Sequence, residues 1–274
     1  MRCSAVRWPR QWQRHESAHH PSQPALQCSA QLRRDAMNGT VKATAMILAA
    51  GRGKRMRPLT DTTPKPLLKV HGKPLIEWHL EALARGGVRA VVINTAWLED
   101  SIVETLGDGS RWGLAIRYSL EGRDHGDALE TAGGIAKALP LLAETFWLVS
   151  ADIYAPGFEF DAGEAAAFAR SDHLAKLWLV PNPPFHPGGD FGLDADGMGL
   201  ADAAGPDGQR WTYANIALCR RALCAGIAPG TVAALGPLLY AGMRERRIAA
   251  ARYDGVWENV GTPEQLAALN ASPG

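Results

Sequence analysis

Three features that would assign this chain to a common class of protein are missing from its sequence. No apolar run reaches the length of about 20 residues that a transmembrane helix needs, so we expect no membrane association. Only four cysteines occur in 274 residues, and their spacing fits neither a disulfide framework nor a metal site, which predicts reduced thiols in a cytoplasmic protein. The formal net charge is only +1, far from the basic excess of a nucleic-acid-binding domain.

Residues 1–36 differ in composition from the rest of the chain. They hold six arginines but only two acidic residues, and they show no periodic apolar face. We predict that residues 1–44 are a disordered tail or result from a mis-assigned start ahead of Met37. Without the first 36 residues, 23 basic and 26 acidic residues remain, a net charge of −3. Residues 45–274 are therefore predicted to form a single domain without a nucleic-acid partner.

Apolar strand patterns and amphipathic helix patterns alternate through the rest of the chain. Strands are predicted over 46–50, 90–94, 114–118, 145–152, 174–180, 211–218 and 248–253, and helices over 74–85, 97–106, 162–170 and 235–246. This alternation predicts an α/β fold, a Rossmann-like three-layer sandwich with a mainly parallel mixed sheet. Ligands of such sheets bind at the carboxyl ends of the strands, which makes the loop after the first strand a candidate site.

The loop after the first strand combines glycines with positive charge. Gly51 and Gly53 permit a sharp turn, and Lys54 and Arg55 follow directly. Lys65 lies between two prolines, whose φ angles are nearly fixed. The pattern predicts a phosphate-binding loop. It lacks the Gly-Lys-Ser/Thr end of a P-loop and the third glycine of the dinucleotide fingerprint, so a Rossmann dehydrogenase is disfavoured.

The run Leu-Ala-Ala-Gly-x-Gly-x-Arg-Met-x-Pro-Leu-Thr over 48–60, followed by Pro-Lys-Pro-Leu over 64–67, resembles the signature of the sugar-1-phosphate nucleotidyltransferases. The resemblance extends from about Met46 to Leu266. It implies the nucleotide-diphospho-sugar transferase type of sandwich and two small-molecule substrates. The phosphate of a sugar 1-phosphate would attack the α-phosphorus of a nucleoside triphosphate, and pyrophosphate would leave.

The family's motifs carry site roles onto matching positions of this chain. They imply nucleotide binding by Ala50, Gly51, Gly53, Lys54, Arg55, Lys65, Glu130, Gly133 and Ser150. Arg55 and Lys65 are the implied catalytic residues, Arg55 at the leaving pyrophosphate and Lys65 at the charge that grows during transfer. Glu130 and Gly133 come from the Leu-Glu-Thr-Ala-Gly-Gly segment, which closes over the nucleotide in the family.

The resemblance also implies Mg²⁺ held by Asp152 and Asn259, with two departures from the family pattern. Related uridylyltransferases carry Asn-Gly-Asp where this chain has Ser150-Ala151-Asp152. The family's final signature has Asp where this chain has Asn259, which removes one negative charge from the metal site. We therefore expect either an enzyme that binds its metal more weakly or a catalytically weak nucleotide-sugar sensor.

Sugar-phosphate binding is implied for Asn182, Gly189, Asp190 and Asn215. The Asn-Pro-Pro and Gly-Asp-Phe motifs are typical of uridylyltransferases that use UTP and N-acetylmuramate 1-phosphate, a cell-wall recycling step. A mannose-1-phosphate guanylyltransferase or a glucose-1-phosphate uridylyl- or thymidylyltransferase remains the alternative. His186 is interpreted as an exposed loop histidine without chemistry. The oligomeric state is left open between a monomer and a small homo-oligomer.

Overall fold

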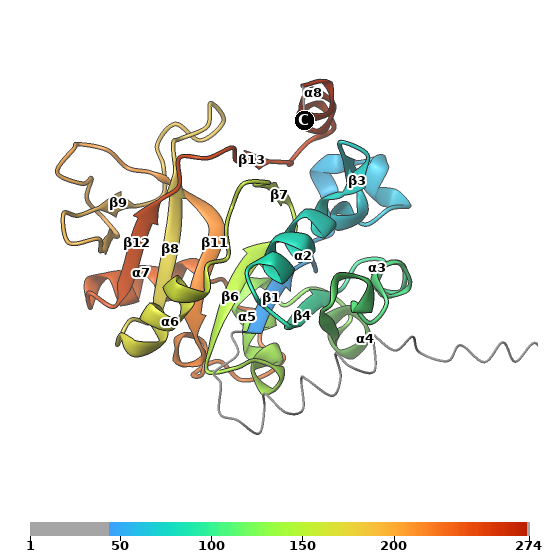
Figure 1. The fold of residues 1–274 in the computed structure, drawn as a ribbon, viewed down its shortest axis with the longest axis horizontal. Helices are drawn as coiled ribbons and strands as arrows, with labels where there is room; N and C mark the ends of the chain where they lie inside the picture. Colours follow the sequence, from blue (N-terminus) through green and yellow to red (C-terminus); the bar gives the residue numbers. More distant parts are fainter. Residues whose placement is uncertain (1–43, 273–274) are drawn as a thin grey trace, which may run out of the picture. The chain divides into compact units, whose positions relative to one another are not determined.

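The computed structural model describes residues 44–272, and the predicted tail therefore lies almost wholly outside the described residues. A seven-stranded sheet forms the centre, with the strand order β12-β8-β11-β6-β1-β4-β5 (Figure 1). Its strands are β1 (Thr44–Leu48), β4 (Ala90–Thr95), β5 (Ala115–Leu120), β6 (Thr145–Ser150), β8 (Ala175–Val180), β11 (Thr212–Arg220) and β12 (Ile248–Arg252). Each of them overlaps a strand predicted from the sequence.

The sheet is mixed but mainly parallel, as predicted. β1 runs parallel to both β4 and β6, and β4 runs parallel to β5. β11 is antiparallel to its neighbours β6 and β8, while β12 is parallel to β8. The carboxyl ends of the central parallel strands consequently lie at one edge, where the glycine loop follows β1.

Helices cover both faces of the sheet and produce the three layers. The principal helices are α2 (Leu75–Arg85), α3 (Glu99–Leu106), α4 (Glu121–His125), α5 (Glu130–Ala138), α6 (Ala162–Arg170), α7 (Gly236–Arg244) and α8 (Pro263–Ala271). Buried side chains of α2, α3 and α6 pack with Ala45 and Ile47 on one face of β1. Those of α5 and α7 share a second apolar cluster with Met46 on the other face. Alternate residues of one strand thus enter different cores.

Short elements complete the chain around the ends of the strands. The 3₁₀ helices are η1 (Lys54–Met56), η2 (Leu59–Asp61), η3 (Lys65–Leu67), η4 (Ser110–Trp112), η5 (Leu139–Leu141) and η6 (Arg221–Leu223). Two-residue strands pair as β2 (Lys69–Val70) with β3 (Lys73–Pro74), β9 (Gly192–Leu193) with β10 (Gly199–Leu200), and β7 (Ile153–Tyr154) with β13 (Glu258–Asn259). None of the helices in the described residues is long and apolar enough to cross a bilayer.

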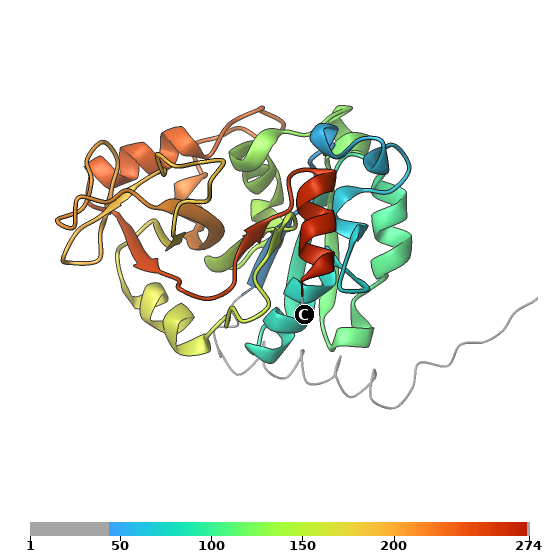
Figure 2. The same ribbon diagram turned by 90° about the horizontal axis from the view of Figure 1, so that it is seen from above.

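The C-terminal helix packs on the segment that follows the glycine loop. Both ribbon views draw α8, in red, beside the blue and cyan segment that follows β1 (Figure 2). Leu266 of α8 belongs to a third apolar cluster with Met56 and Val70. Just before this helix, β13 pairs with β7 in antiparallel fashion, and Val260 N donates a hydrogen bond of 3.0 Å to Asp152 O. This pairing brings Asn259 next to Asp152, although 107 positions separate the two residues in the sequence.

Candidate active site

Two adjoining cavities open at the carboxyl ends of β1 and β6. The first has a volume of about 440 Å³ and the second about 650 Å³. Both are lined by Leu48 and Ser150, which end the two strands, and by Glu130 and Thr131 at the start of α5. The two cavities therefore adjoin at these shared residues.

Most of the predicted site residues line one of the two cavities. The first is lined by Ala50, Gly51, Gly53, Lys54, Arg55, Lys65, Glu130, Ser150 and Asp152. The second is lined by Asp190, Asn215 and Asn259, together with Glu130 and Ser150. The structure thus brings together residues that lie up to 209 positions apart in the sequence.

The glycine loop is held in one conformation by side chains behind it. Gly53 has a φ of 63°, and an added Cβ would lie 3.0 Å from Cγ2 of Thr60. Thr60 Oγ1 donates a hydrogen bond of 2.8 Å to Gly53 O, and Thr60 O accepts one of 2.9 Å from Trp97 Nε1. The Arg52 guanidinium stacks 3.9 Å above the centre of the Trp97 ring. These contacts pre-organise the loop for a ligand.

Lys65 and Asp152 form an ion pair in the first cavity. Lys65 Nζ lies 2.8 Å from Asp152 Oδ2, and the Lys65 side chain is only 9% exposed. An ammonium removed from water needs such a partner. The neighbouring Ala151 also lines this cavity, but it is only 1% exposed and belongs to the apolar core cluster.

Asn259 supplies an oxygen that has no protein partner. Its Oδ1 atom is buried, and no hydrogen bond reaches it from the described residues. A buried acceptor without a donor carries a desolvation penalty, so it indicates a site for a donor or cation. The backbone of Asp152 is hydrogen-bonded to Val260, the residue after Asn259, and the two side chains line the two adjoining cavities. Mg²⁺ in phosphate-binding enzymes commonly takes one or two protein oxygens and the rest from phosphates and water. The chemistry of these donors fits Mg²⁺. Within 44–272, no cluster of three or more His, Cys, Asp or Glu side chains offers an alternative metal centre.

A histidine from α2 supports the turn that carries Asp152. His79 Nε2 lies 2.9 Å from Ile153 O, so the ring nitrogen must carry the proton and donate it. His79 is 2% exposed. Burial lowers the pKa of His79 from 6.5 to about 4, while the bond to Ile153 and the charge of Asp152 act in the opposite direction. His79 is therefore neutral at pH 7.

A buried polar network links the two sides of the first cavity. Ala49 N donates to Asn94 Oδ1 at 3.0 Å, and Asn94 Nδ2 donates to Glu121 Oε1 at 2.7 Å. The other carboxylate oxygen of Glu121 accepts from Leu129 N at 2.8 Å. Burial raises the pKa of Glu121, and the bonds from Leu129 and Asn94 oppose that rise. The network connects the end of β1 to Leu129, which directly precedes the predicted nucleotide residue Glu130.

Close packing at Gly134 depends on this network. A Cβ atom added there would lie 2.6 Å from Glu121 Oε1 and 2.8 Å from Asn94 Nδ2. Glycine is therefore needed where α5 passes over the carboxylate.

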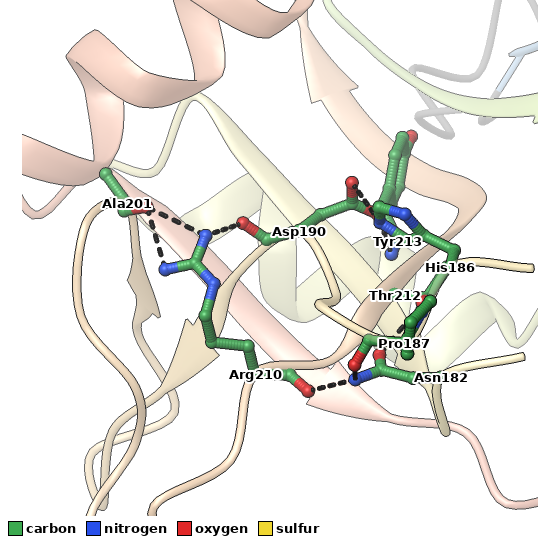
Figure 3. A network of polar contacts seen from close by, with 8 residues as sticks. All are labelled: Asn182, His186, Pro187, Asp190, Ala201, Arg210, Thr212 and Tyr213. Atoms are coloured by element: carbon green, nitrogen blue, oxygen red, sulfur yellow. Dashed lines mark hydrogen bonds and ion pairs between the residues drawn. The ribbon is translucent and has the colours of Figure 1, made fainter. Parts of the chain in front are cut away.

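The loop between β8 and β9 forms one side of the second cavity and is stabilised by its own polar contacts (Figure 3). Asn182 Nδ2 donates to Pro187 O at 3.1 Å and to Arg210 O at 2.9 Å. Asn182 Oδ1 accepts from Thr212 Oγ1 at 2.9 Å. Asn215 also lines this cavity, and its φ of 57° is an uncommon value for a residue other than glycine.

Three predicted binding residues line neither cavity. The amide of Asn182 is used within the loop, as described above. Gly189 has a φ of 60°, and an added Cβ would lie 2.7 Å from Asn182 Oδ1. Gly133 approaches the backbone of another segment, because an added Cβ would lie 2.2 Å from Thr231 O. In the described structure these residues shape the cavities from behind.

Sequence reasoning did not assign roles to His79, Asn94, Glu121 and Thr131. His79 lies on an apolar helix face, and a lone histidine there carries no specific signal. Asn94 ends a buried strand, a position at the ligand-binding edge of the sheet, and this could have marked it as a candidate. The partnership of Asn94 with Glu121 across 27 positions is visible only in the tertiary structure.

The chain belongs to the nucleotidyl transferase family. Residues 44–192 match the family model described under that name, and the described fold agrees with it.

Named relatives extend the match along the chain. It is 47% identical to N-acetylmuramate alpha-1-phosphate uridylyltransferase of Neisseria meningitidis serogroup B, over 84% of this chain and 98% of that protein. It is 33% identical to the enzyme of the same name from Caulobacter vibrioides, over 83% of this chain and 95% of that protein. A crystal structure of a provisionally named glucose-1-phosphate thymidylyltransferase from Bacillus anthracis superposes with a TM-score of 0.69 at 18% identity, covering 84% and 94% of the two chains. This last likeness shows the shared fold.

The low pKa of His79 predicts a loss of stability in acid. The unfolded chain binds a proton with a pKa of 6.5 and the folded protein only with a pKa of about 4. The titration of His79 therefore leaves the free energy of unfolding unchanged above pH 6.5 and lowers it by about 3 kcal/mol as the pH drops to 4. Urea unfolding gives the free energy of unfolding of the wild type and of His79→Gln between pH 4 and 7.5. Plotted against pH, the two free energies should converge towards acid pH. Parallel curves would show that His79 does not titrate in this way.

Proposed function

We propose that this protein transfers a uridylyl group from UTP to N-acetylmuramate 1-phosphate and releases pyrophosphate. The observation that carries the proposal is the pair of adjoining cavities, one around the glycine loop and one around the loop between β8 and β9, which meet next to Ser150. The names of two relatives that match nearly over their whole length support the choice of base and sugar.

The first cavity suits a nucleoside triphosphate. Its glycine loop presents backbone N–H groups, and Lys54 and Arg55 add positive charge on the same segment. Gly51 has open space where a Cβ would point, so a phosphate can approach its backbone closely. Glu130 and Thr131 at the other side lie between the nucleotide and the sugar.

The reaction needs no general base. The attacking oxygen belongs to the sugar phosphate, which is already an anion, and it forms a bond to the α-phosphorus of UTP. The bond between that phosphorus and the bridging oxygen breaks, and the electron pair leaves with pyrophosphate. The protein contributes positioning and positive charge. Lys65 lines the first cavity and would exchange its contact with Asp152 for a contact with a phosphate oxygen.

Asp152 and Asn259 would hold Mg²⁺, with the substrate phosphates completing its ligands. The ion supplies charge neutralisation and alignment of the phosphate groups when it is bound. Lys65 already partly compensates Asp152, and Asn259 is uncharged. The protein therefore offers little net negative charge, and we expect metal to bind well only together with the nucleotide.

Other sugars and bases remain alternatives within the same reaction class, chiefly mannose 1-phosphate with GTP and glucose 1-phosphate with UTP or dTTP. A second candidate function is a nucleotide-sugar sensor with weak catalysis, which Asn259 favours because the amide weakens the metal site. The sensor and the enzyme both bind nucleotide, so turnover distinguishes them.

The first experiment measures pyrophosphate release by the full chain with Mg²⁺ and N-acetylmuramate 1-phosphate. UTP, dTTP, GTP, CTP and ATP are supplied in turn, followed by the 1-phosphates of mannose, glucose and N-acetylglucosamine. We expect the highest kcat/KM with UTP and N-acetylmuramate 1-phosphate. Nucleotide binding without turnover for every sugar would favour the sensor.

Replacement of the buried lysine should affect turnover much more than nucleotide binding. Lys65→Met removes the cation that faces the transferred phosphate, so we expect kcat to fall by about 10² to 10³. The dissociation constant for UTP, measured by calorimetry, should change less than tenfold. Lys69→Met, at an exposed position of β2, is the matched control and should leave both quantities unchanged. Equal losses in kcat and UTP affinity would contradict this role.

Restoring the missing charge should strengthen the metal site. Asn259→Asp adds a carboxylate next to Asp152, and we expect the Mg²⁺ concentration for half-maximal rate to fall by about tenfold. Calorimetric titration with Mn²⁺ in the presence of UTP gives an independent measure of metal affinity. Glu258→Gln is the matched control, because neighbouring side chains of a strand point to opposite faces and Glu258 is exposed. Unchanged metal affinity in Asn259→Asp would argue against a role of this position in metal binding.

A further inference from the structure

The second cavity has an unusual distribution of charge for a site that takes an acidic sugar. Glu130 and Asp190 contribute carboxylates to its lining, and His186 contributes an imidazole. Among the described residues that line this cavity there is no lysine and no arginine. His186 is therefore the one basic side chain among the described residues of this lining.

One contact holds the backbone of His186 and a second holds its ring. Its backbone N–H donates a hydrogen bond of 2.8 Å to Pro183 O. Its Nε2 atom lies 3.0 Å from Asp190 Oδ1, and Asp190 Oδ2 accepts a hydrogen bond of 2.8 Å from Tyr213 N (Figure 3). Because Nε2 is engaged with Asp190, Nδ1 is left to meet a ligand, and it is a donor in the protonated ring. The side chain is 41% exposed, so a ligand can reach it.

The nearby guanidinium of Arg210 is used elsewhere. Its Nη1 atom donates to the carbonyl oxygens of Ala201 and Ala203 at 3.3 and 3.4 Å. Its Nη2 atom donates to Asp190 O and Ala201 O (Figure 3). Arg210 does not line the cavity. Its charge supports the backbone of the loop and is not directed at a ligand.

We propose that His186 is a specificity-determining residue that recognises the carboxylate of an acidic amino-sugar phosphate. This inference rests on the proposed function, whose sugar differs from N-acetylglucosamine by a lactyl ether that ends in a carboxylate. A carboxylate bound in the cavity that Glu130 and Asp190 line would lose hydration and be repelled by their charges in the absence of a cation. The protonated imidazole, held by Asp190, donates Nδ1–H to the lactyl carboxylate and offsets both effects.

The test compares two sugars that differ only in the lactyl group. N-acetylmuramate 1-phosphate and N-acetylglucosamine 1-phosphate are assayed with saturating UTP and Mg²⁺, and the ratio of their kcat/KM values is measured for each protein. In His186→Gln we expect this ratio to fall by about 10- to 100-fold, the range of a hydrogen bond to a charged group. His186→Lys returns a cation and should recover most of the ratio. The KM for UTP should stay unchanged in both variants.

Two further measurements distinguish an error in the role of His186 from an error in the proposed function. With the wild type, the methyl ester of the lactyl group should give a kcat/KM that is lower than that of the acid by the same factor as His186→Gln shows with the acid. This comparison uses only the wild-type protein, so it does not depend on whether a variant folds. Phe185→Leu, next to His186, should change both sugars alike. A wild type that prefers the acidic sugar while His186→Gln and the ester keep the same preference would overturn the role of His186 and leave the proposed function standing. A wild type that transfers to neither sugar would overturn both.

Discussion

The ion pair between Lys65 and Asp152 is the contact on which the candidate site depends. It joins the segment after the glycine loop to the end of β6 across 87 positions, and it satisfies an ammonium group that is almost fully buried. Loss of Asp152 would leave the buried Lys65 ammonium without a partner, which is destabilising, whereas the Asp152 side chain is 38% exposed and would stay in contact with water if Lys65 were lost. The same pair also sets the electrostatics of the site. A bound phosphate can form an ion pair with Lys65, and a bound cation can be coordinated by Asp152. Substrate binding would therefore replace the contact between the two side chains by contacts with ligand charges.

Around this pair, the residues that hold the backbone in place differ from the charged residues that face the cavities. The central parallel strands end at one edge and carry Leu48, Asn94 and Ser150 to it, while the loops that follow them supply the charged groups. Behind the loops, uncharged or internally paired groups hold the backbone in place, as His79 does at Ile153 and Asn94 does at Ala49. This division explains how a solved structure with 18% identity can share the fold at a TM-score of 0.69. The sheet and its cores tolerate substitution, and the loops determine which substrate is accepted.

The second cavity illustrates the same division on a smaller scale. Asn182, Gly189 and Arg210 act on the backbone of the loop between β8 and β9, and they leave Asp190 and His186 to face the cavity. Motif similarity had grouped Asn182 and Gly189 with the sugar-binding residues and had assigned no role to His186. A residue can be part of a binding motif because it shapes the loop, and a motif alone does not distinguish that role from contact with the substrate.

The fold class, the succession of strands and helices along the chain and the family were all predictable from the sequence, because apolar periodicity and the glycine loop are local patterns. The sequence also indicated Lys65, Asp152 and Asn259, since each lies in a short motif. The tertiary structure alone decided which of these residues meet. The pairing of β13 with β7 places Asn259 beside Asp152, the ion pair joins Lys65 to Asp152, and Glu121 reaches Asn94. Such contacts arise from packing between distant segments, and no local pattern encodes the distance between them.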